Sequence, residues 1–195
     1  GYTDNISYTE NTKHNESNDD KEILEELSTP LMRYLNYLFS RLGKDGIMEI
    51  GLGDWCPPGV KEDEFKTPLA VTDTILTYDI AVKSAFVYEV LGQQPQRQFA
   101  LALAERVKTA FREKLLNKET GEIKGGTQTG QAMAIYYGML TVEEKPKALK
   151  LLIKYIADED GHFYTGVLGG RVLYRVLAEN GYVDLAYNMI VRPDY

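Results

Sequence analysis

The chain has 195 residues, of which 44% are hydrophobic and 26% charged, values ordinary for a globular domain, and its formal net charge is −7. One cysteine excludes a disulfide framework, and two histidines are too few for a histidine-built metal site unless carboxylates complete it. The acidic balance argues against nucleic acid as a partner, and no apolar run approaches the roughly 18–20 residues of a membrane span, so we expect no membrane partner either.

Residues 1–20 are rich in Asn, Ser, Asp and Thr, and they predict a polar loop. A short apolar stripe at helical spacing follows from residue 21. Thr29 is a predicted helix N-cap and Pro30 the first position of a new helix, whose apolar stripe runs from Leu31 to Leu42. Residues 43–66 carry five glycines and two adjacent prolines, and a connection of this length is usually functional or disordered.

Helical spacing returns at Thr67–Pro68 and continues to residue 91, and a second helix is predicted from about residue 95 to 116. After a polar turn, we predict helices over about 129–140, 141–157, 171–179 and 183–191, with Thr141 as a cap and a loop over 158–170. No segment alternates with a period of two. The sequence therefore predicts an all-α fold of stacked αα-hairpins over residues 21–195, and the unequal hairpins favour a toroid over a regular solenoid.

Asp54 and Trp55 in the glycine-rich loop combine a carboxylate with an indole ring. This pair suits sugar recognition, because the ring covers an apolar C–H face of the sugar while the carboxylate accepts hydroxyl hydrogen bonds. The alternative interpretation is structural: Trp55 anchors the long loop on the core and Asp54 caps a turn.

Two further segments carry candidate ligand-binding residues. Gln128 lies where Thr127–Thr129 opens a helix, so free N–H groups, hydroxyls and an amide meet there; the alternative is a plain N-cap. His162 follows the acidic run Asp158–Asp160, and it either holds a hydroxyl group or is structural. The acidic run lacks the ligand pattern of a calcium loop, so a solvated helix end is favoured. With no phosphate-binding loop and no nucleophile elbow in the sequence, we expect no cofactor and no metal.

Three segments resemble a known family in their order and spacing: Gly53–Trp55, Thr127–Thr129, and the run Tyr164–Gly169 leading into Leu177–Tyr187. They resemble the catalytic domain of bacterial α-L-rhamnosidases, glycoside hydrolase family 78, over about residues 20–195. The resemblance implies an (α/α)6 toroid, of which this chain supplies a part, because seven or eight predicted helices fall short of twelve. It also implies that Trp55 stacks on the deoxysugar ring, that Asp54 supports the cleft, and that His162 and, less directly, Gln128 line the same mouth.

The resemblance places both catalytic carboxylates of the family outside this sequence. The family's general acid is a glutamate in an arginine-containing motif upstream of the Gly-Asp-Trp loop, and its general base is a glutamate in an aromatic segment that follows the position of Tyr195. We therefore assign no catalytic residue here. We expect a fragment of an inverting glycoside hydrolase that releases terminal α-L-rhamnose from glycosides or polysaccharides. The alternatives are a non-catalytic helical module that binds carbohydrate or protein, and a toroidal glycosidase of different sugar specificity.

A partial toroid leaves apolar helix faces uncovered, and we expect the rest of the catalytic domain or a second copy to cover them. The polar N-terminal residues show no leader. The sequence is therefore compatible with a cytoplasmic protein and equally with an internal part of a longer secreted precursor.

Overall fold

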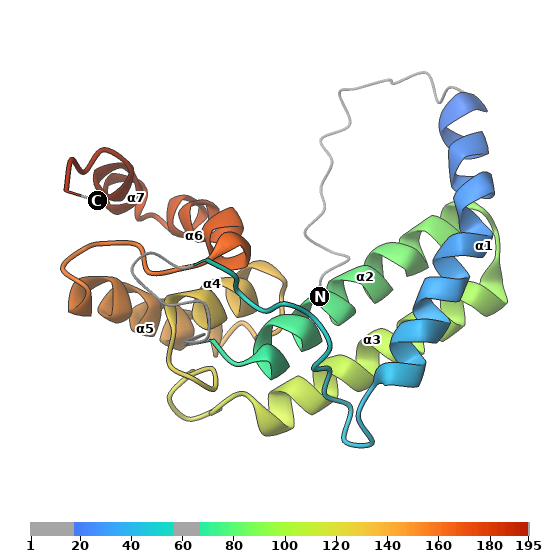
Figure 1. Ribbon diagram of the computed structural model, residues 1–195, viewed down its shortest axis with the longest axis horizontal. Helices are drawn as coiled ribbons and strands as arrows, with labels where there is room; N and C mark the ends of the chain where they lie inside the picture. Colours follow the sequence, from blue (N-terminus) through green and yellow to red (C-terminus); the bar gives the residue numbers. More distant parts are fainter. Residues whose placement is uncertain (1–17, 57–66, 195) are drawn as a thin grey trace.

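A computed structural model describes residues 18–56 and 67–194, with side chains from residue 21 onward (Figure 1). Within these ranges there are seven helices and no strand, apart from an isolated antiparallel bridge between Leu116 and Ile123. The helices are α1 (Asn18–Arg41), α2 (Leu69–Val90), α3 (Gln94–Lys114), α4 (Gln128–Tyr136), α5 (Lys145–Asp158), α6 (Val167–Glu179) and α7 (Val183–Ile190). The prediction of an all-α fold is confirmed.

The helices are arranged as hairpins in two layers (Figure 1). Helices α2, α4 and α6 form an inner row in which each contacts the next, and α3, α5 and α7 pack on them as outer partners, while α1 packs against α2 and α3. Every residue of α4 from Gln128 to Ile135 is buried, as expected for a helix with neighbours on all sides. The N-termini of α2, α4 and α6 lie at one end of the inner row, because the Thr67 hydroxyl just before α2 donates to the Thr127 hydroxyl just before α4 at 2.9 Å, and Asp54 binds both Thr129 of α4 and the Gly166 amide just before α6.

The predicted apolar stripes face the core. On α3, for example, Leu103, Val107 and Phe111 recur at a spacing of four residues and are all buried. Helix α5 begins at Lys145, later than the predicted start at Thr141, and Glu144 is its N-cap; in the turn before it, the Thr141 hydroxyl accepts from the Glu144 amide at 3.3 Å, and the Glu144 carboxylate accepts from the Thr141 amide at 2.8 Å. This reciprocal pair satisfies two N–H groups that the start of a helix otherwise leaves without partners.

Glu144 also joins two helices. Its two carboxylate oxygens accept hydrogen bonds of 2.6 and 2.9 Å from the Arg112 guanidinium on α3. Burial alone would raise the pKa of Glu144, but the hydrogen bonds from Arg112 and Thr141 and the positive charge of Arg112 lower it below its ordinary value. Glu144 therefore remains ionised in the fold and ties the start of α5 to α3.

The predicted helix boundary at Thr29–Pro30 is wrong, because α1 continues through Pro30 as one helix. Contacts before the proline explain this. Ser28 is buried, its hydroxyl donates to Gln93 at 2.7 Å, and its carbonyl accepts from the Tyr88 hydroxyl at 3.0 Å. Packing on both sides of Pro30 thus offsets the lost backbone hydrogen bond. Helix α1 also begins at Asn18, three residues inside the expected polar loop, of which residues 1–17 lie outside the described residues.

Helix α7 leaves an apolar face open. The α7 stripe is defined here as Val183, Tyr187 and Ile190 together with Val191 at the C-cap; each is more than half exposed, whereas Ala186 and Met189, further round the helix, are buried. Side chains spaced three and four residues apart lie on one face of a helix, so the stripe is a continuous surface.

None of the helices in the described part of the chain is long and apolar enough to span a membrane.

Candidate functional site

The glycine-rich segment 47–56, here called the strap, lies along the first turns of α2 (Figure 1). The Met48 amide donates to the Thr74 hydroxyl at 3.0 Å, and the Ile50 and Gly51 amides donate to one oxygen of Asp73 at 2.8 and 2.6 Å. These contacts descend α2 towards its N-terminus as the strap proceeds. The last residues of the strap therefore lie at the end of the inner row where α2, α4 and α6 begin.

Gly53 makes the final approach possible. Its φ is +69°, a conformation that side chains with a Cβ rarely adopt, and a Cβ there would lie 2.8 Å from Leu69 of α2. The residue that follows, Asp54, turns inward and is 4% exposed.

Asp54 binds the N-terminus of α6 and the start of α4. One carboxylate oxygen accepts from the Leu168 and Gly169 amides, both at 2.9 Å, and the other accepts from the Gly166 amide at 2.7 Å and from the Thr129 hydroxyl. Gly166, the N-cap of α6, has no side chain to do this, so Asp54 provides the cap from another part of the chain. Each carboxylate oxygen of Asp54 thus accepts two hydrogen bonds from within the protein.

Trp55 is fixed by its backbone and open at its side chain. Its carbonyl accepts from the Val167 amide at 2.9 Å, while 51% of the residue is exposed. A Cβ at Gly166 would clash with the carbonyl oxygens of Asp54 and Trp55, so glycine is required for this close approach. The indole ring is therefore presented to solvent from a backbone that is hydrogen-bonded to α6.

Gln128 is 3% exposed and all its polar atoms are used within the protein. Its side-chain nitrogen donates to the carbonyls of Tyr155 and His162 at 3.3 and 3.1 Å, and its oxygen accepts from the Tyr164 amide at 2.8 Å. These bonds fix the connection between α5 and α6 against the start of α4. Gln128 thus shapes the loop around the site from inside.

The His162 side chain faces the end of the chain and is 26% exposed. Its Nδ1 lies 3.0 Å from the Glu159 carbonyl and its Nε2 lies 3.4 Å from a carboxylate oxygen of Asp194. Hydrogen bonds from Arg192, together with the charges of Arg192 and His162, hold the pKa of Asp194 well below its usual range. Backbone contacts link His162 to Gln128, and Thr129 links the start of α4 to Asp54, but the four predicted side chains do not converge on one point.

A hollow of about 240 Å³ adjoins Gln128. It is lined by Gly126, Thr127, Gln128, Tyr155, Asp158, Glu159 and Tyr164. Burial and a 2.7 Å hydrogen bond to the Glu122 carboxylate raise the pKa of Tyr155, which therefore remains a hydroxyl donor across the physiological range. Sequence reasoning assigns neither tyrosine to the site: Tyr164 is only the first residue of a run that resembles the family, and nothing in the sequence distinguishes Tyr155 from the other tyrosines.

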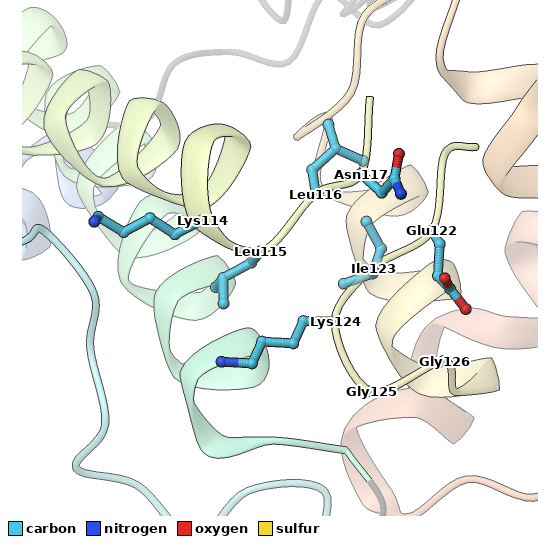
Figure 2. A pocket seen from close by; sticks show the side chains of 9 residues that line it. All are labelled: Lys114, Leu115, Leu116, Asn117, Glu122, Ile123, Lys124, Gly125 and Gly126. Atoms are coloured by element: carbon cyan, nitrogen blue, oxygen red, sulfur yellow. The ribbon is translucent and has the colours of Figure 1, made fainter. Parts of the chain in front are cut away.

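A larger cleft of about 520 Å³ lies on the other side of the turn at Gly126 (Figure 2). The side chains of Lys114 and Lys124 extend to the same side of it, whereas Glu122 is directed towards Tyr155. Both hollows therefore flank the turn that opens α4.

Across residues 18–56 and 67–194, no group of three or more His, Cys, Asp or Glu side chains is arranged to hold a metal ion.

Comparison with known protein families shows to which family the chain belongs. Residues 10–195 match the bacterial alpha-L-rhamnosidase six-hairpin glycosidase domain. The chain belongs to this family. Its described helices accordingly form part of an (α/α)6 toroid, which confirms the predicted architecture.

Relatives with this domain are much longer than the chain. It is 29% identical over 192 residues to an alpha-L-rhamnosidase of Formosa agariphila and 26% identical over 183 residues to one of Alteromonas sp. strain LOR, covering 90% of this chain in each case. The chain spans only 19% and 20% of the lengths of these two relatives.

Solved structures show the same relationship. The alpha-L-rhamnosidase of Dictyoglomus thermophilum matches 91% of this chain with a TM-score of 0.81 and 26% identity, over 20% of its own length. That of Streptomyces avermitilis, solved in complex with L-rhamnose, matches 91% of this chain with a TM-score of 0.78 and 25% identity, over 16% of its own length. This chain of the rhamnosidase family therefore corresponds to one segment of such enzymes.

Proposed function

We propose that this chain is the part of an α-L-rhamnosidase that presents a sugar-stacking surface at the mouth of the toroid. The observation that supports the proposal is the geometry of Trp55, whose half-exposed ring projects from a backbone hydrogen-bonded to α6. An exposed indole on an anchored backbone suits the apolar face of a 6-deoxysugar, because the backbone need not be ordered when the ring is covered. The substrate would be a glycoside or polysaccharide with a terminal rhamnose.

In this proposal the proton transfers belong to carboxylates outside the chain. An inverting glycosidase needs an acid that protonates the glycosidic oxygen and a base that activates water, roughly 6.5–9.5 Å apart. Asp54 is unsuited to either role, since its oxygens already accept four hydrogen bonds. The contribution of this chain is to bind and orient the sugar: Trp55 contacts it, Asp54 holds the backbone on either side, and Gln128 and His162 shape the neighbouring loop.

The rest of the toroid is the proposed partner of the α7 stripe. Three side chains on the last described helix and one at its C-cap, all largely apolar and each more than half exposed, are suited to packing against another hairpin. A second copy of the chain is the alternative occupant. Analytical ultracentrifugation separates the two: a monomeric chain that forms a one-to-one complex with the separately produced remaining domain supports the first, and a stable dimer that Tyr187→Lys in the α7 stripe dissociates supports the second.

The lone tryptophan provides a direct binding test. Titration of the chain with L-rhamnose should change the emission of Trp55, and an equal concentration of L-fucose, a 6-deoxysugar of different stereochemistry, should change it less. In the intact enzyme, Trp55→Ala should lower kcat/KM on an aryl α-L-rhamnoside at least about tenfold, the loss of roughly 1.4 kcal/mol of transition-state binding. Undiminished turnover by Trp55→Ala would refute the proposal.

A panel of aryl glycosides addresses the competing functions. Turnover of a different sugar in preference to rhamnose would favour a toroidal glycosidase of other specificity. Binding of rhamnosides by the intact protein with no hydrolysis of any member of the panel would favour a non-catalytic carbohydrate-binding module.

A further inference from the structure

A second buried aspartate acts on the strap upstream of Asp54. Asp73 lies on α2, is 7% exposed, and accepts from two consecutive strap amides with a single oxygen, from Ile50 at 2.8 Å and from Gly51 at 2.6 Å. Its other oxygen accepts from the Thr72 hydroxyl at 3.2 Å. A carboxylate held in this way on a rigid helix is a fixed point for the strap, because hydrogen bonds to a charged acceptor are stronger than neutral ones.

The spacing of the strap contacts defines a register on α2. Met48 bonds Thr74, Ile50 and Gly51 bond Asp73, and Gly53 approaches Leu69, so the strap and the helix run in opposite directions with paired positions. Gly51 leaves no slack at the central pairing: a Cβ there would lie 2.7 Å from an oxygen of Asp73. A shift of one residue along α2 would separate Asp54 from α6 and move Trp55 with it.

We propose that Asp73 is a positioning residue for Trp55: by binding the Ile50 and Gly51 amides it fixes the register of the strap and hence the place of the indole ring at the mouth. The role of the ring in sugar binding rests on the function proposed above, whereas the positioning itself does not. Without Asp73, the segment from Gly51 to Gly53 contains two glycines and has no hydrogen bond to α2, so its backbone gains conformational entropy. Sugar binding would then have to order this segment, and the entropy cost would weaken the affinity.

The first test needs no ligand, because Trp55 is the only tryptophan. Asp73→Ala should increase acrylamide quenching and lower the fluorescence anisotropy of Trp55 while the helical far-ultraviolet circular dichroism is retained. Asp79→Ala is the matched control: Asp79 lies on the same helix, is 9% exposed, and binds Lys83 at 2.6 Å instead of the strap. The control should leave Trp55 fluorescence unchanged. A folded Asp73→Ala variant with wild-type quenching and anisotropy would overturn the proposal.

Gly51→Ala keeps the test decisive if Asp73→Ala does not fold. Gly51 does not have a positive φ, so the obstacle to alanine is contact with the Asp73 side chain. Gly51→Ala should therefore loosen Trp55 in the same direction. Asp73→Asn should restore most of the wild-type signal, since one amide oxygen can still accept from both backbone amides. Wild-type Trp55 mobility in Gly51→Ala, or no recovery in Asp73→Asn, would also contradict the proposed role.

The consequence for catalysis is measured in the intact enzyme. Asp73→Ala should raise KM for an aryl α-L-rhamnoside about five- to tenfold with kcat nearly unchanged, because ordering the strap on binding weakens affinity without touching the reacting atoms. A loss confined to kcat would contradict positioning. If Trp55 responds to Asp73→Ala but not to rhamnose, the proposed function fails while the positioning role stands.

Discussion

Asp54→Asn tests the cap that the strap provides for α6. Asparagine has one acceptor oxygen, and in its best orientation that oxygen retains the Leu168 and Gly169 amides while the new NH2 group faces Thr129. The Thr129 hydroxyl can rotate and accept, but the buried Gly166 amide then has no acceptor. The variant thus keeps the shape of the site and removes one charge and one hydrogen bond.

The magnitude follows from these losses. A buried amide without a partner costs about 1–3 kcal/mol, the two retained bonds each lose roughly 0.5–1 kcal/mol when their acceptor becomes neutral, and the lost charge at the start of α6 adds about 0.5–2 kcal/mol. Because neighbouring contributions are not additive, we expect a total of about 3–5 kcal/mol. In urea, with a slope of at most about 3 kcal/mol/M, the midpoint should fall by about 1 M or more.

Circular dichroism and Trp55 emission should report the same urea transition, since the strap and α6 are joined at Asp54. Asp45→Asn is the control: Asp45 lies on an exposed part of the same connection, and its carboxylate accepts from the Ile47 amide at 3.2 Å, a contact that asparagine can keep. The control should change stability by less than about 0.5 kcal/mol. A loss below about 1 kcal/mol in Asp54→Asn would show that the cap contributes little.

Three further results are expected. Gly166→Ala should lower the thermal midpoint strongly, because the new Cβ would meet the backbone carbonyls of Asp54 and Trp55. Gly170→Ala is the control and should leave the midpoint unchanged or raise it, because its new Cβ has a neighbour only at 3.5 Å. Equal effects of the two substitutions would contradict the close approach of strap and α6. Gln128→Leu should cost about 2–3 kcal/mol in urea denaturation by removing the three hydrogen bonds that the buried Gln128 side chain makes to the backbone of Tyr155, His162 and Tyr164, and a neutral result would mean that water replaces these bonds. Glu144→Gln should make stability less dependent on pH at the acid end. The pKa of Glu144 is lowered in the folded state, so the stability that its charge contributes is fully present above its ordinary pKa of 4.5 and is lost as the pH falls through the folded-state pKa. Urea midpoints between pH 3 and 6 that decline as steeply in the variant as in the wild type would contradict this.

Local patterns in the sequence predict most of the helices because each outer helix buries one side. Leu103, Val107 and Phe111 form such a stripe and are buried as predicted. The failure at Pro30 has the opposite origin, since the contacts that keep α1 continuous come from Tyr88 and Gln93, about 60 residues away. The local signal for a helix start was therefore misleading, because the packing that keeps α1 continuous joins residues too far apart in the sequence for a local pattern to reveal.

The candidate site was less accessible to sequence reasoning for the same reason. Whether Asp54 contacts a sugar or caps a turn depends on partners 112–115 residues further along the chain, and the structure shows the cap. Its contribution to substrate binding, like those of Trp55, Gln128 and His162, stays a prediction. Asp73 did have a signal: an aspartate between two threonines within the apolar face of a helix has to find a partner when it is buried.

The cap on α6 also bears on how this domain folds. Nothing within α6 or its preceding turn satisfies the amides of its first residues; the acceptors arrive on a segment more than 110 residues earlier in the chain. Closing so long a loop is slow and entropically costly, so the α6/α7 hairpin should gain hydrogen-exchange protection only when the segment 47–56 has docked. Any truncated domain that begins after residue 56 would start α6 with exposed amides, and its last hairpin would fray even with its own sequence intact.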